Sequence, residues 1–94
     1  MAASLPEDLV MYSQSPVFDQ DSVPAALQKD HSTKAGVWAR AVVSHGSIEY
    51  VLETKPGHPL VVTAGQHALI EPEVPHHVRV IGPVVFQLQF YRAE

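Results

Sequence analysis

The stretch Gly65–Val78, GQHALIEPEVPHHV, places a strand-like run, a turn with two prolines and a histidine in that order. Pro72 and Pro75 each fix the backbone angle φ of the turn, so the residue that follows points in one direction. In a small β-barrel this order presents an imidazole at the open end of the barrel. His76 is therefore the first candidate for a functional side chain. A residue at such an open end is expected to pack against few neighbours and to add little stability.

The composition restricts the class of protein. A chain of 94 residues is expected to form one domain, here residues 1–94. The formal net charge of −4, without a basic cluster, argues against a nucleic acid or an anionic membrane as partner. The absence of cysteine excludes disulfides and thiolate metal sites. Because the sequence shows neither a leader pattern nor an apolar run that could cross a bilayer, a cytoplasmic location is expected.

Short strand patterns separated by turn residues fill most of the chain. Strands are predicted at residues 37–43, 47–53, 60–63, 67–71, 77–81 and 84–91. His45-Gly46 is interpreted as a turn or a β-bulge between the first two of these strands, and Gly82-Pro83 as a turn between the last two. Residues 1–15 are expected to form an arm or an edge strand, and residues 23–28 remain ambiguous between a short helix and irregular structure. The prediction is an all-β sandwich or barrel with helix content below roughly 15%.

Several short strings carry a resemblance to a known family. Residues 65–76 resemble the second motif of the cupin superfamily, and Gly46 resembles the glycine that closes the first. More closely, the chain is similar to the TehB/YeaR-like family in five strings taken in order, which are residues 16–19, 23–27, 31–38, 71–76 and 90–92. The resemblance covers roughly residues 5–92 and implies a single cupin-like conical β-barrel, or double-stranded β-helix sandwich. The resemblance also indicates that residues 23–30 form a strand.

The family consists of small domains found alone or at the N-terminus of a tellurite-resistance methyltransferase, and the resemblance implies no defined activity. The sequence lacks the glycine-rich cofactor site of a methyltransferase, as well as the phosphate-binding, Gly-x-Ser-x-Gly and His-Glu-x-x-His motifs. Methyl transfer is therefore not expected to reside in this chain. Any part that it plays in tellurite or other oxyanion resistance would be binding or sensing.

The cupin resemblance also implies a candidate metal site. Metal-binding cupins supply His-x-His and a Glu from the first motif and one His from the second. Here the first of these places reads His31-Ser32-Thr33, and Arg40 stands near the place of the Glu. His31 and His76 alone would hold one divalent ion such as Zn, Fe or Ni weakly, unless His45 or Glu71 turned inward as a third ligand. His77 follows His76 on an extended chain and is expected to face the other way.

Two hypotheses of different class follow. The first, which the incomplete ligand set favours, is a binding module in which His31, His76 and Arg40 surround a small molecule or an oxyanion. The second is a mononuclear metal-dependent enzyme of the cupin type. Arg40 itself is interpreted either as an anion-binding group or as the partner of Glu49 or Glu71, because an unpaired buried charge is costly. Exposed strand edges favour a homodimer.

Overall fold

Six strands of one antiparallel sheet account for most of the chain in a computed structural model, which describes residue 6 and residues 8–93. Of the arm or edge strand expected at residues 1–15, residues 1–5 and 7 lie outside the described part of the chain. The elements are β1 (Leu9–Gln14), β2 (Phe18–Asp19), the 3₁₀ helix η1 (Ala25–Gln28), β3 (Trp38–Leu52), β4 (Leu60–Thr63), β5 (His67–Ile70) and β6 (His76–Ala93). The described residues contain no α-helix, which confirms the all-β prediction.

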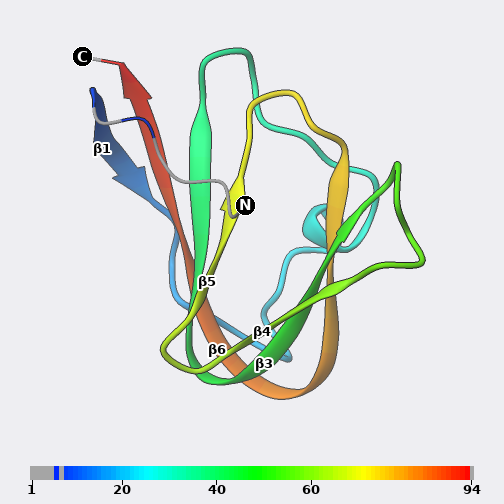
Figure 1. Cartoon of the computed structure of the whole chain (residues 1–94). Coiled ribbons are helices and arrows are strands. Elements are labelled where there is room, and N and C mark those ends of the chain that lie inside the picture. Colours follow the sequence, from blue (N-terminus) through cyan, green and yellow to red (C-terminus); the bar gives the residue numbers. More distant parts are fainter. Residues whose placement is uncertain (1–5, 7, 94) are drawn as a thin grey trace.

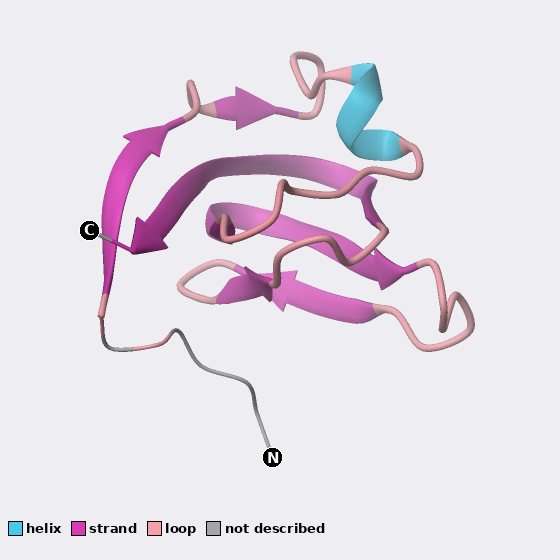
Figure 2. Ribbon diagram, turned by 90° about the horizontal axis from the view of Figure 1, so that it is seen from above, coloured by secondary structure: helices cyan, strands magenta, loops and turns pink. Residues whose placement is uncertain are grey.

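Two long strands, β3 and β6, form the centre of the sheet. They pair with each other from Trp38 opposite Tyr91 to Leu52 opposite His76. The strand β1 continues the sheet beyond β6, β4 continues it beyond β3, and β2 and β5 pair with β6 and β3. Both long strands turn sharply near their middle, so that their two halves face each other (Figure 1). In the view from above, β1 and β2 lie along one side and η1 at one corner (Figure 2).

Of the two alternatives expected at His45-Gly46, the structure has the bulge, whereas the turn expected at Gly82-Pro83 is wrong, because both pairs lie inside continuous strands. The register between β3 and β6 shifts at Val43/His45 and again at Gly46/Ile48, which marks β-bulges. Bulges bend a strand without ending it. Gly46 adopts φ 71°, and a side chain there would place its Cβ 2.0 Å from the carbonyl oxygen of Pro83. The bend therefore depends on a close approach of two backbones that only glycine permits.

Residues 25–28 form a short 3₁₀ helix, so the strand favoured by the family resemblance at residues 23–30 is wrong. Pro24 precedes this helix, and the amide of Leu27 donates to the carbonyl of Pro24 over 3.1 Å. The half-buried side chains of Val23 and Leu27 pack against the core from this segment. A hydrogen bond between residues three apart is the pattern of a 3₁₀ turn, and an extended strand cannot form it. None of the described helices is long and apolar enough to cross a membrane.

The core fills the space between the two halves of the sheet. Phe86 is 1% exposed and stacks at a tilt on Phe18, with ring centres 5.6 Å apart. The buried side chains alternate along the strands, as period-two patterning predicts. They include Ala39, Ala41 and Val43 on the first half of β3, Ile48 and Tyr50 on the second, and Val84, Phe86 and Leu88 on β6. At the margin of the sheet, β1 pairs with β6 alone among the described strands.

Candidate functional site

His31 and His76 lie directly opposite each other at the start of β6. Their backbones exchange two hydrogen bonds, from the amide of His31 to the carbonyl of His76 over 2.9 Å and in reverse over 2.7 Å. Residues paired in this way project their side chains to the same face. The imidazole rings meet edge to face, with centres 5.7 Å apart. The structure therefore brings together two segments that are 45 residues apart in the chain.

His76 is buried rather than placed at an open end. It is 2% exposed, and the ring of Tyr50 packs against it with centres 5.2 Å apart. The expectation that it packs against few neighbours is wrong, because Tyr50 contacts the ring and apolar side chains such as Leu88 and Phe90 line the cavity beside it. Tyr50 is a site residue that the sequence analysis missed. Its alternation with Ile48 in the predicted strand 47–53 was the available signal, since that pattern already placed Tyr50 on the inner face.

The environment of His76 fixes its protonation. Burial lowers the pKa of His76, and the neighbouring His31 adds to this, although the hydrogen bond to Val74 opposes them. At neutral pH the ring is thus neutral. Its Nδ1 lies 2.8 Å from the carbonyl oxygen of Val74, which can only accept, so Nδ1 carries the proton. The other nitrogen, Nε2, keeps its lone pair, and no described residue donates to it.

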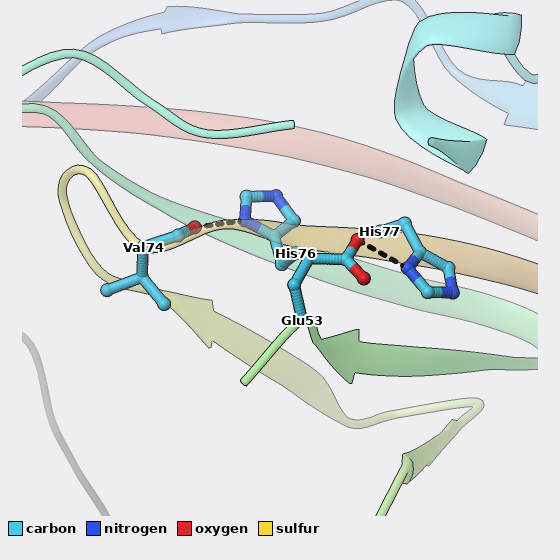
Figure 3. Close-up of polar contacts among 4 residues, drawn as sticks. All are labelled: Glu53, Val74, His76 and His77. Carbon is cyan, nitrogen blue, oxygen red and sulfur yellow. Dashed lines mark hydrogen bonds and ion pairs between the residues drawn. The ribbon is translucent and has the colours of Figure 1, made fainter. Parts of the chain in front are cut away.

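The neighbouring His77 is held on the opposite side of β6. Its Nδ1 lies 2.7 Å from a carboxylate oxygen of Glu53, which pairs the two side chains. Figure 3 shows the two adjacent imidazoles pointing away from each other, each toward its own acceptor. The arrangement follows from the extended backbone, whose successive side chains alternate between faces. His77 therefore does not contribute to the site of His31 and His76.

A small cavity lies beside the two histidines. Its volume is about 10 Å³, and apart from His31, His76 and Thr33 its walls are apolar side chains, among them Val78 and Leu88. A cavity of roughly 10–15 Å³ holds about one water molecule. The space therefore accommodates an ion or a water, but not an organic molecule. A larger surface hollow of about 440 Å³ lies over β4 and the turn to β5, and the two histidines are not part of it.

The two proposed third ligands lie elsewhere. His45 is exposed at the bend of β3, seven residues before Leu52, the partner of His76. At about 3.3 Å per residue this separation is on the order of 20 Å. Glu71 is exposed and lines a neighbouring hollow of about 120 Å³ together with Tyr50. Among the described residues, no group of three or more histidine, cysteine, aspartate or glutamate side chains could hold a metal.

Arg40 also lies apart from the histidines. It stands on β3 between Ala39 and Ala41, which are buried on the inner face, so its side chain points to the outer face. There it donates to Gln89 and to the hydroxyl of Tyr91, both on β6. Among the described residues, neither expected partner forms an ion pair with Arg40, and Glu49 pairs instead with Arg79 over 3.4 Å. The structure thus separates Arg40 from the pocket of His31 and His76.

Comparison of this chain with known proteins identifies relatives in one protein family. The family model described as the TehB-like domain matches residues 13–88. The probable S-adenosyl-L-methionine-dependent methyltransferase TehB of Haemophilus influenzae is 30% identical over 79 residues, which are 80% of this chain and 28% of that protein. The uncharacterized protein YeaR of Escherichia coli is 24% identical over 98 residues, which are 95% of this chain and 82% of that protein.

Two solved structures have the same fold. The crystal structure of a protein from Escherichia coli K12 superposes with a TM-score of 0.89 at 24% identity and covers 99% of both chains. The crystal structure of TehB from Haemophilus influenzae superposes with a TM-score of 0.84 at 28% identity, over 93% of this chain and 32% of that one. The present chain therefore spans less than a third of the methyltransferase relatives that it matches.

Proposed function

Because the chain belongs to the TehB-like domain family, we propose that it is a binding module whose ligand sits in the cavity at His31 and His76. The observation that carries the proposal is the state of His76. It is a buried imidazole whose Nδ1 proton is committed to a backbone carbonyl, and its Nε2 lone pair has no described partner. Fixing one ring nitrogen in this way orients the other toward a ligand.

The ligand that fits best is a single divalent transition-metal ion such as Zn²⁺, Ni²⁺ or Fe²⁺. Two imidazoles that share a tetrahedral ion at about 2.0–2.1 Å have ring centres roughly 5 Å apart. The observed 5.7 Å is close to this value, and the cavity of about 10 Å³ has room for one ion. With two protein ligands the ion would be held weakly, and water would complete its coordination. A bound ion would supply Lewis acidity.

An oxyanion or an organic ligand fits this cavity less well. The walls are mostly apolar and the imidazole of His76 is neutral, so a negative charge would find no compensation there. Arg40, which was expected to supply that charge, points to the other face of the sheet. For these reasons we favour the metal ion over the small molecule or oxyanion. A role in tellurite resistance, as the family resemblance implies, would then rest on binding rather than on chemistry in this domain.

Calorimetric titration with Zn²⁺ and Ni²⁺ at pH 7.5, on protein purified without a histidine tag, tests the proposal. Weak one-to-one binding is expected in the wild type and should be lost in His31→Gln and in His76→Gln. His77→Gln is the matched control, because that neighbouring ring faces Glu53 instead. Binding that survives His76→Gln, or equal losses in His76→Gln and in His77→Gln, would reject the site. Tightly held stoichiometric metal in the purified protein would instead support the metal-dependent enzyme.

Three further expectations accompany this proposal. We propose that the bent sheet is a cupin-like barrel, supported by the two halves of β3 and β6 that face each other across the core (Figure 1). We propose a homodimer, supported by the unpaired edge of β1, where Val10, Met11 and Tyr12 are 40–46% exposed. We propose a cytoplasmic location, supported by a chain without cysteine.

The edge of β1 suits dimer formation better than that of β4. At β4 the side chain of Gln66 accepts from the backbone amide of Thr63 over 3.1 Å, and the amide of Gln66 donates to the carbonyl of Thr63 over 2.9 Å. These contacts occupy backbone groups of β4 that a further strand would need. β1 carries neither a charged residue nor a proline in its sequence LVMYSQ. Edge strands of monomers usually contain such residues, which discourage pairing.

A further inference from the structure

The outer face of the sheet carries a cation, Arg40, for which the described residues supply no counter-charge. Arg40 is half-buried there, with Leu69 of β5 and Gln89 of β6 as its partners on the adjacent strands. The ion pairs among the described residues are those of Glu53 with His77 and of Glu49 with Arg79. Neither involves Arg40. A cation that has lost part of its hydration attracts an anion more strongly than an exposed one does.

The guanidinium is held in one orientation by β6. Its Nη2 donates to the side-chain oxygen of Gln89 over 3.0 Å and to the hydroxyl of Tyr91. The Tyr91 hydroxyl donates in turn to the same Gln89 oxygen over 3.1 Å. The charge also lies 5.2 Å from the centre of the Tyr91 ring, as in a cation–π contact. Because these contacts already fix the side chain, a ligand would bind without the entropy loss of ordering a free arginine.

Two guanidinium nitrogens remain without a protein acceptor. Nε is shielded from solvent and has no hydrogen-bond partner among the described residues. Nη1 has none either, and it is not sealed from solvent. Buried donors in proteins are nearly always satisfied, so an exception calls for an explanation. An arginine that serves only the stability of the fold would be expected to meet a carboxylate, whereas this one is held by neutral groups.

We propose that Arg40, positioned by Gln89 and Tyr91, forms a second binding site for a small molecule that bears a carboxylate or a comparable oxyanion. The anionic oxygen contacts Nη1, while the side chains of Leu69 and Tyr91 flank the charge. A planar guanidinium is well suited to carboxylate and other oxyanion groups. The site is independent of the histidine pocket, since Arg40 and His76 lie on opposite faces of the sheet. A negative result for the Arg40 site would therefore leave the proposal for the histidine pocket unaffected, and the converse also holds.

The chain contains its own reporter for this site. Trp38, its single tryptophan, is the cross-strand partner of Tyr91 and shares the outer face with Arg40. Its fluorescence should respond saturably when acetate or sulfate replaces chloride at constant ionic strength. Arg40→Gln should weaken that response by at least about tenfold, the loss expected for one charge-assisted hydrogen bond. Arg40→Lys keeps the charge but not the planar group, so its fluorescence response should lie between those of the wild type and of Arg40→Gln.

Two surface variants serve as controls. Arg79→Gln removes an arginine that is 63% exposed on another part of the sheet, and it should leave the response unchanged. Glu71→Gln removes a carboxylate two positions along the chain from Leu69, the cross-strand partner of Arg40. An unchanged response in this variant shows that Glu71 does not compete with the oxyanion for Arg40. Urea unfolding of each variant verifies its fold. If Arg40→Gln does not fold, Tyr91→Phe provides the second test, because it removes an acceptor of Nη2 and should weaken the response.

Three results would overturn the proposal. The first is an equal response to chloride and to the two oxyanions. The second is a response that Arg40→Gln and Tyr91→Phe leave unchanged. The third is a change of sedimentation mass in Arg40→Gln without any oxyanion effect in the wild type, since this would assign Arg40 to an interface between subunits.

Discussion

Gly46→Ala should damage this fold far more than an ordinary glycine replacement. The backbone at Gly46 has φ 71°, and alanine in that region costs about 1–2 kcal/mol. The new Cβ would also stand 2.0 Å from the carbonyl oxygen of Pro83, so β3 and β6 must separate by about 1 Å. That shift displaces Val84, which pairs with Gly46 and is 2% exposed. Burial of a valine contributes about 1.5–3 kcal/mol, so with the backbone cost a total loss of about 2.5–5 kcal/mol is expected.

Gly36→Ala is the matched control. Gly36 has φ 77°, close to that of Gly46, but a Cβ there would meet nothing within 4 Å. Only the backbone cost of about 1–2 kcal/mol should therefore appear. Urea unfolding followed by Trp38 fluorescence measures both variants, with an unchanged slope as the check that the transition remains comparable. If the two losses agree within about 0.5 kcal/mol, the contact between Gly46 and Pro83 does not support the bend, and this reasoning is refuted.

Three further outcomes are expected. The pKa of His76 is lowered below 6.5 in the folded state, so the unfolded chain takes up the proton first as the pH falls. The free energy of unfolding measured in urea should therefore decrease below about pH 6.5. His76→Gln should remove this part of the pH dependence. Burial, and to a smaller extent the charge of Glu71, raise the pKa of Tyr50 to about 12. A titration followed by phenolate absorbance should therefore show one step near the upper end of the pH range, which Tyr50→Phe abolishes. The free energy of unfolding should decrease as the pH rises from 10 toward 12. Sedimentation should give a dimer that Val10→Glu on β1 dissociates and Val61→Glu on β4 preserves; a monomer throughout would refute the dimer.

The sequence by itself determined the class of fold and the local direction of many side chains. Alternation of Ile48 and Tyr50 with Ser47 and Glu49 predicts a strand with one buried face, and that strand is observed. The opposite orientations of His76 and His77 follow from the same rule and need no tertiary information (Figure 3). The strand at residues 60–63 is predicted at its observed bounds, because turn residues flank a short apolar run. These features depend on neighbours in the chain, which a sequence displays directly.

The continuity of β3 and β6 was decided by the tertiary structure alone. A glycine with positive φ marks both a turn and a bulge, so the local pattern at Gly46 cannot distinguish them. The pairing of Gly46 with Val84 on β6 makes it a bend in one strand. Similarly, Pro24 is compatible with a strand or a helix, and the hydrogen bond from the amide of Leu27 to the carbonyl of Pro24 is present in the 3₁₀ turn alone.

The candidate site shows the same division. The sequence named His31 and His76, but their pairing, the burial of His76 under Tyr50 and its fixed tautomer arise only when distant segments close over one another. Arg40 was grouped with them because it is a cation near the place of a cupin ligand, yet the strand places it on the opposite face. Residue type and periodicity can be read directly from the sequence. Which side chains are buried, which partners they contact and which residues line a pocket depend on how the strands pair. Those contacts join residues far apart in sequence, and no local pattern encodes them.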